Sequence, residues 1–238
     1  MNPDFGRSQG FLFGLCLQVG FEKETQLMHP QVQRPYFNEE IETINRPFGL
    51  IVYIYNMNTR ERLISITSDL IRKKGYFGTG INEILKQVAV PKGSLYHHFP
   101  NGKDELIREA VYYGGESQMH KYGNALRGKP AEEGLAAMID VMVEELTASN
   151  FEDACPIAAV AMASGSIDDD IRAACAKVFV GWQNDLAGYL ERRGVDNAQQ
   201  KAEELYAMFE GAYVLSKAHK DVKYLLLQKK FIAVILNS

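Results

Sequence analysis

The sequence has few cysteines, and those it has are scattered. The chain has three cysteines, an odd number, which are Cys16, Cys155 and Cys175. No two of them have the close spacing of zinc ligands. No apolar run approaches the roughly 18 residues of a membrane-spanning helix. Phe11–Val19 is apolar but short and lacks a small-residue cleavage site, so a signal peptide is not expected. These absences exclude disulfide-rich and helical membrane proteins and favour a cytoplasmic protein with free thiols.

Motifs that carry catalysis are also missing. The chain has no Gly-rich phosphate loop, no Gly-x-Ser-x-Gly and no His-Glu-x-x-His. His97 and His98 are neighbours, so on a helix their side chains point about 100° apart and do not face one metal ion. The run 168–170 is three aspartates, which suits the positive end of a helix better than a cation site. We therefore expect no enzyme, no cofactor and no metal.

Charge is distributed unevenly along the chain. The net charge of −4 argues against a general nucleic-acid coat protein. Residues 57–110 hold nine Lys and Arg against six Asp and Glu, a net charge of +3, whereas residues 111–238 hold thirteen against eighteen, a net charge of −5. A basic segment joined to an acidic remainder suggests a small module that binds DNA on a larger body that does not.

The character of the sequence changes at Met57. Residues 1–56 contain four prolines and show no sustained helical period, whereas helical periodicity begins at Asn58. We hypothesise that Met57 is the natural initiator and that residues 1–56 are a disordered or misassigned extension. The alternative is a genuine N-terminal arm, although its four Lys and Arg against six Asp and Glu disfavour DNA contact.

The remainder of the chain predicts an all-α protein. Leu63, Ile66, Leu70 and Ile71 have the spacing of an amphipathic helix, and Gly75 is placed to end it. No segment shows strand alternation, and no repeat of roughly 20–50 residues is present. The expected helices cover residues 59–75, 79–88, 92–99, 103–127, 131–149, 155–163, 168–193, 197–219 and 222–236.

Two of these helices are short and adjacent, as in a helix-turn-helix. Thr79 is expected to cap the first, and Pro91 favours the start of the second. A three-residue turn joins them, and in such a motif the second helix enters the major groove of DNA. The apolar side chains that would form the small core are Ile81, Ile84, Leu85, Val88, Leu95 and Phe99.

Residues 91–100 read PKGSLYHHFP and are followed by GKDEL. This stretch, within residues 79–108, resembles the DNA-binding domain of the TetR family of transcriptional regulators, in the branch that contains LmrA and YxaF. Residues 154–161 and 210–212 resemble segments of the same branch. The resemblance covers residues 57–238. It implies a ligand-responsive homodimeric repressor on a palindromic operator, with an activator as the alternative.

The resemblance also implies a domain division and roles for single residues. The helix-turn-helix domain would span residues 57–102, and the ligand-binding and dimerisation domain residues 103–238. Thr79 and Lys103 would hold phosphates of double-stranded operator DNA, and Lys92 would make a base contact. The residues expected at the groove are Lys92, Gly93, Ser94, Tyr96 and His97.

Two positions depart from the family pattern. Ala89 stands where glycine is usual, which would strain the turn if it needs a positive φ. Pro91 stands where many members have a capping Ser or Thr. The altered turn supports a rival hypothesis, in which the chain is an all-α small-molecule carrier or enzyme with a vestigial DNA-binding module.

The last two helices are expected to form the dimer, as the resemblance implies. Two such helices from each subunit would build a four-helix interface. The alternative is that their apolar faces only pack inside one subunit. The apolar residues in question are Leu205, Phe209, Ala212 and Tyr213, followed by Leu225, Leu226, Phe231, Ile232, Val234 and Ile235.

A small hydrophobic effector is expected among the C-terminal helices. Met and aromatic side chains suit a pliable apolar cavity, although each of them alone suits a protein core better. The branch implies a planar, drug-like or flavonoid-like ligand. The candidate pocket residues are Met138, Met142, Met162, Phe179, Trp182, Gln183, Tyr206 and Phe209.

Overall fold

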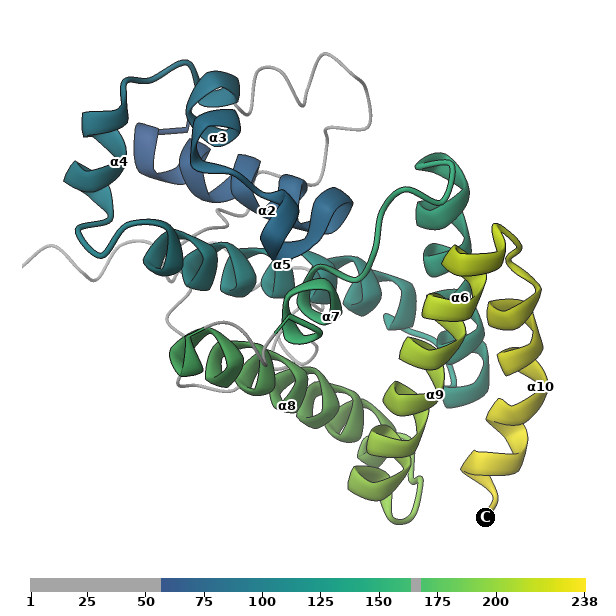
Figure 1. The fold of residues 1–238 in the computed structure, drawn as a ribbon. Coiled ribbons are helices and arrows are strands. Elements are labelled where there is room, and N and C mark those ends of the chain that lie inside the picture. The colour runs from purple at the N-terminus through teal and green to yellow at the C-terminus, as the bar shows by residue number, and fades with distance from the viewer. Residues whose placement is uncertain (1–56, 164–167) are drawn as a thin grey trace, which may run out of the picture.

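The computed structural model describes residues 57–163 and 168–238, and every regular element in these ranges is a helix (Figure 1). The all-α prediction is confirmed. The hypothesis that residues 1–56 are an extension lies outside the described residues, as does Cys16. The helices are α2 (Thr59–Gly78), α3 (Ile81–Val88), α4 (Lys92–His98), α5 (Lys103–Leu126), α6 (Ala131–Ala148), α7 (Pro156–Ala161), α8 (Asp169–Glu191), α9 (Ala198–His219) and α10 (Lys223–Leu236).

Local capping explains where several of these helices begin and end. α2 begins with a capping box, in which the Asn58 side chain accepts from the Glu61 amide at 3.0 Å and Glu61 accepts from the Asn58 amide at 2.9 Å. Gly75 has φ 66° and breaks the regular helix, as expected. Asp168 accepts from the Asp170 amide at 2.7 Å, so the aspartate run does cap a helix.

The predicted cap at Thr79 is wrong. Gly80 is the N-cap of α3, and Thr79 is fully buried, with its hydroxyl donating to the Gly75 carbonyl oxygen at 2.7 Å. Gly75 has left the helical conformation, so its carbonyl oxygen lacks the usual helical donor, and the Thr79 hydroxyl takes that place.

Two hydrophobic cores share α2 and α5. The smaller core holds the predicted residues Ile84, Leu85, Val88, Leu95 and Phe99 together with Leu63, Ile64, Leu70 and Leu106. The larger core takes in the next residue of each shared helix, Ile71 on α2 and Ile107 on α5, and extends through α6 to α10. A displacement of α2 or α5 therefore acts on both cores.

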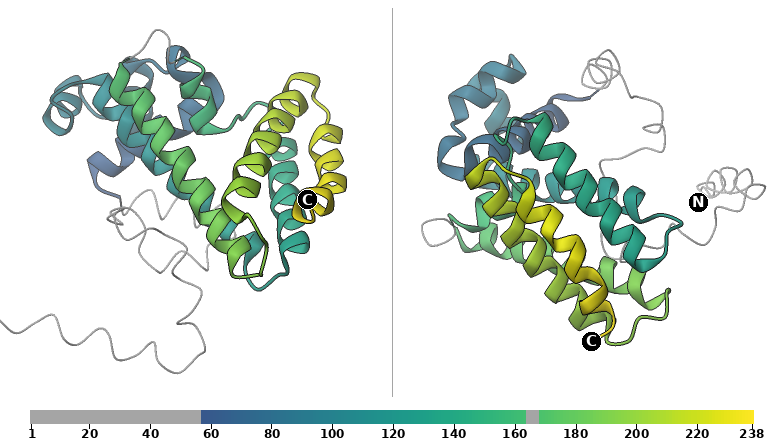
Figure 2. Two further views of the ribbon diagram at one scale, coloured as in Figure 1. Left: turned by 90° about the horizontal axis from the view of Figure 1, so that it is seen from below. Right: turned by 90° about the vertical axis from the view of Figure 1, so that its right-hand side faces the viewer.

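The C-terminal helices form a layered bundle beside the small core. α9 packs between α8 and α10, and α10 also packs on α6 (Figure 2). Cys155 and Cys175 are buried free thiols, and burial raises the pKa of Cys175 to about 11. Across the described ranges, no helix combines the length and apolar character needed to cross a bilayer.

Candidate nucleic-acid interface and effector cavity

The turn between α3 and α4 is held by a residue in the left-handed conformation. Ala89 has φ 58° and ψ 49°, and the Val90 amide donates to the Leu85 carbonyl oxygen at 3.2 Å. A side chain in this conformation costs about 1 kcal/mol relative to glycine. The turn thus keeps the positive φ that glycine usually supplies, and the departure at Ala89 does not change its shape.

α4 is anchored to α2 through its inner face. Leu95 and Phe99 are fully buried in the small core. The Arg60 guanidinium lies 5.2 Å from the centroid of the Phe99 ring, and Arg62 donates to the Val88 carbonyl oxygen at the end of α3. These contacts hold the end of α3 and the C-terminal end of α4 against α2, so the direction of the outer face of α4 is also fixed.

The outer face of α4 carries the residues that were predicted to meet DNA. Lys92, Gly93, Tyr96 and His97 are exposed, and Ser94 is half-buried. Lys92 Nζ lies 6.0 Å from the centroid of the Tyr96 ring, so the two side chains share one surface. A Cβ built on Gly93 would meet no atom within 4 Å, so nothing within the described chain requires glycine there.

The two predicted phosphate contacts are less accessible. The Thr79 side chain is fully buried and its hydroxyl is occupied by Gly75, so it does not reach the surface in this conformation. Lys103 is half-buried, and its ammonium donates to the Tyr76 carbonyl oxygen at 3.2 Å and lies 4.3 Å from the Tyr76 ring centroid. Burial lowers the pKa of Lys103.

Several of the predicted effector residues come together in the larger core. The Trp182 ring stacks on Tyr206 at 6.0 Å and meets Phe179 edge-on at 5.7 Å. The Trp182 indole N–H donates to the Gly115 carbonyl oxygen at 3.0 Å. Met138, Met142 and Phe209 are buried in the same core, and Gln183 is half-buried.

Met162 does not belong to this group. Its side chain is 80% exposed because α7 ends at Ala161 and Met162 occupies the C-cap. The prediction that Met162 lines an apolar pocket is wrong.

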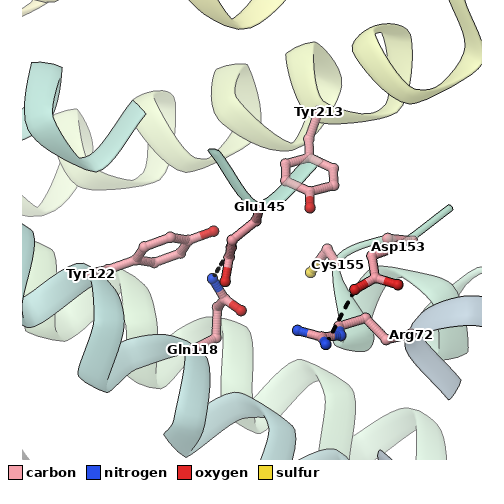
Figure 3. Close-up of a pocket in the computed structure, with 8 residues that line it drawn as sticks. Arg72, Gln118, Tyr122, Glu145, Asp153, Cys155 and Tyr213 are labelled. Atoms are coloured by element: carbon pink, nitrogen blue, oxygen red, sulfur yellow. Dashed lines mark hydrogen bonds and ion pairs between the residues drawn. The ribbon is translucent and has the colours of Figure 1, made fainter. Parts of the chain in front are cut away.

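A small polar cavity, which sequence reasoning missed, lies next to this core. Its volume is about 10 Å³, room for about one water molecule. None of the predicted effector residues lines it. The lining residues, seven of them labelled in Figure 3, are Arg72, Gln118, Tyr122, Glu145, Asp153, Ala154, Cys155 and Tyr213.

Ion pairs and hydrogen bonds organise the polar cavity. The Arg72 guanidinium lies 3.1 Å from the Asp153 carboxylate, and the Gln118 amide donates to Glu145 at 2.7 Å (Figure 3). Burial raises the pKa of the Tyr122 and Tyr213 hydroxyls, which are therefore neutral. The sequence pointed to this site only in part. Residues 154–161, which resemble a segment of the LmrA and YxaF branch, include the lining residue Cys155.

Comparison with known proteins agrees with this geometry. Residues 63–110 match the family described as bacterial regulatory proteins, tetR family, and residues 131–230 match the C-terminal domain of LmrA/YxaF-like transcriptional regulators. The uncharacterised HTH-type transcriptional regulator YxaF of Bacillus subtilis is 34% identical over 189 residues, which cover 76% of this chain and 96% of YxaF. The HTH-type transcriptional regulator LmrA of the same organism is 30% identical, over 71% of this chain and 92% of LmrA.

Solved structures show the same fold. The reduced form of Escherichia coli NemR superposes with a TM-score of 0.68 at 22% identity, over 74% of this chain and 95% of NemR. A TetR regulator from Legionella pneumophila gives 0.65 at 23% identity, over 74% of this chain and 96% of its own. Fold and site thus define a helix-turn-helix transcriptional regulator. The chain belongs to the TetR family, and its C-terminal domain is of the LmrA/YxaF-like type.

Proposed function

We propose that the chain is a ligand-responsive repressor that binds a palindromic operator as a homodimer and leaves it when a small effector binds. The observation that carries the proposal is the outer face of α4, where Lys92, Tyr96 and His97 are exposed around a glycine that packing does not require. Backbone can approach DNA closely at Gly93. Such a regulator would act in the cytoplasm, where DNA is accessible.

The proposed contacts follow from the geometry of α4. Lys92 stands at its N-terminal end and reads a base, while Ser94, Tyr96 and His97 contact bases or backbone. Lys103 reaches a flanking phosphate if its ammonium leaves the Tyr76 carbonyl. Thr79 is not among the proposed contacts because its side chain is buried.

The proposed dimer uses the outer faces of α9 and α10. The predicted α9 residues Leu205, Phe209, Ala212 and Tyr213 are instead buried inside the subunit, as are Leu225 and Ile232 on α10. Large apolar residues of the opposite faces remain exposed. Exposed apolar patches of this kind commonly mark contacts between proteins, and we propose that a second copy of the chain covers this one. These residues are Val214, Leu215, Leu226, Leu227, Phe231 and Val234.

We propose that the effector binds among α5, α6, α8 and α9 with its hydrophobic body against the aromatic core around Trp182. Binding favours a state whose two recognition helices are wrongly spaced for successive major grooves. α5 is the lever, because it contributes to both hydrophobic cores.

Replacing Gly93 by leucine separates DNA binding from folding. A Cβ at this exposed position meets no protein atom within 4 Å, and leucine favours a helix over glycine by about 0.8 kcal/mol, so thermal stability is expected to stay equal or rise. DNA affinity is expected to fall by roughly tenfold or more because the side chain blocks close approach of the backbone. Melting curves and titration of a fluorescent duplex chosen by selection from genomic fragments measure the two effects.

The matched control is Gly123→Leu on α5, another helical glycine with open space around it. This variant should keep both its stability and its DNA affinity. Unchanged DNA affinity in Gly93→Leu would mean that α4 does not enter the groove, and would favour a carrier with a vestigial DNA-binding module.

A further inference from the structure

The polar cavity lies at the joint between the DNA-binding helices and the C-terminal helices. Its lining comes from α2, α5, α6, α9 and the segment between α6 and α7 (Figure 3). Arg72 on α2 pairs with Asp153, and the Ala154 amide donates to the Arg72 carbonyl oxygen at 2.9 Å. α2 is thereby tied to this segment by an ion pair and by its backbone, so a change in the cavity acts on the DNA-binding helices.

The segment between α6 and α7 is also strained and clamped from the other side. Asn150 and Phe151 both have positive φ, 51° and 61°. The Lys217 ammonium on α9 donates to the carbonyl oxygens of Phe151, Glu152 and Asp153. One short segment therefore connects α2 with α9, which carries part of the exposed apolar face.

Polar atoms in and beside the cavity are buried without partners. Arg72 Nε, Asp153 Oδ1 and Glu210 Oε2 have no hydrogen-bond partner in the described part of the chain. Asp153 is 9% exposed, so its unpaired oxygen has little access to bulk solvent, and the cavity beside it has room for about one water molecule. Buried polar atoms are nearly always paired in folded proteins, and unpaired ones mark sites where a bound molecule completes the pairing.

The cavity suits a positively charged group. Asp153 faces it together with the cation Arg72, whereas Glu145 is already paired with the Lys121 ammonium and with the Gln118 amide. A further carboxyl group, Glu210, lies beside Cys155, and burial raises its pKa. The rings of Tyr122 and Tyr213 are also in the lining (Figure 3). Carboxylates combined with aromatic faces are the surroundings that bind organic cations.

We propose that the polar cavity receives a cationic, N–H-bearing head group of the effector, which replaces Arg72 as the partner of Asp153. This inference rests on the proposed function and names the chemistry of its ligand. Arg72 shows what the site accepts, a planar cation that donates N–H groups to a carboxylate. Its side chain is 27% exposed and has a route to solvent. Displacement of the Arg72 side chain enlarges the cavity of about 10 Å³ and removes the ion pair that holds α2 to Asp153.

Benzamidinium is the probe, because it joins a planar N–H-bearing cation to an aromatic ring, and benzamide is its neutral isostere. Calorimetric titration of the full chain without DNA is expected to show binding of benzamidinium and none of benzamide. Equal binding of the two compounds, or no binding of benzamidinium, overturns the proposal.

Two variants are expected to move the affinity in opposite directions. Asp153→Asn removes the acceptor charge and weakens benzamidinium binding by roughly tenfold or more, whereas Arg72→Ala removes the competitor and strengthens it by a similar factor. If the Arg72–Asp153 ion pair had only a structural role, both variants would weaken benzamidinium binding by the same factor. The matched control Asp140→Asn breaks an exposed pair with Lys229 and leaves binding unchanged. If Asp153→Asn does not fold, the sign of the Arg72→Ala effect decides.

The titration is done without DNA, so its failure is distinct from failure of the proposed function. A chain that binds its operator but not benzamidinium refutes only the ligand chemistry. A chain that binds benzamidinium but no operator refutes the repressor and leaves the site standing.

Discussion

Charged substitutions on the outer face of α10 are expected to yield a monomer that binds its operator at least about 100-fold more weakly. Leu227 and Phe231 are 43% and 45% exposed and lie four residues apart on the same face. The double change Leu227→Glu and Phe231→Glu places two carboxylates in the proposed interface, where a second copy would bury them unpaired. Each subunit then binds one half-site alone and loses the effective concentration that the partner provides.

Sedimentation equilibrium and duplex titration, at matched protein concentration, measure the two parts of this prediction. The control is Val180→Glu on α8, which is 52% exposed but lies outside the α9–α10 face. The control should remain a dimer with full affinity. A double variant that remains dimeric would show that the subunits associate through another surface.

Replacing Gly134 by alanine is expected to destabilise the protein by about 3 kcal/mol. A Cβ at this position would lie 2.0 Å from the Tyr189 hydroxyl oxygen and 3.2 Å from Leu126 Cδ2. Tyr189 is 2% exposed, and its hydroxyl lies 3.0 Å from the carbonyl oxygens of Lys129 and Pro130. The ring has no room to retreat without losing that hydrogen bond.

Denaturant unfolding of the two proteins side by side gives the difference in free energy. Gly123→Ala is the matched control, since it makes the same change within a helix but meets no atom within 4 Å. It should be neutral or stabilising by up to about 1 kcal/mol. Equal stabilities of Gly134→Ala and Gly123→Ala would show that Gly134 and the Tyr189 side chain do not lie as close together as described.

The helices were predictable because their ends carry local signals. Asp168 caps the start of α8, α4 begins after Pro91, and Gly75 breaks α2, all as the sequence indicated. Thr79 was misjudged because its hydroxyl has two possible uses, as a cap or as a donor to a carbonyl left free by a nearby break. Sequence spacing alone does not decide between them.

The outer face of α4 was predictable for the same local reason, because a seven-residue helix with Leu95 buried within it and Phe99 buried at its C-cap has one face left for solvent. The polar cavity was not. Arg72 lies far in the sequence from Glu145 and Asp153, and it meets them only through packing of α2 on the C-terminal helices. The burial of Leu205, Phe209, Ala212 and Tyr213 inside the subunit was not predicted because α9 is apolar on two sides, and the sequence does not tell which side faces inward.

The most direct test of the central claim is the affinity of the full chain for its selected operator across a series of salt concentrations, with Lys92→Ala beside it. We predict that the logarithm of affinity falls steeply and linearly with the logarithm of salt concentration. Loss of Lys92 from each subunit should weaken the free energy of operator binding by about 1–3 kcal/mol per lysine and relax the choice of base at one position in each half-site. If no genomic fragment binds better than random DNA and Lys92→Ala changes nothing, the chain does not read DNA through α4.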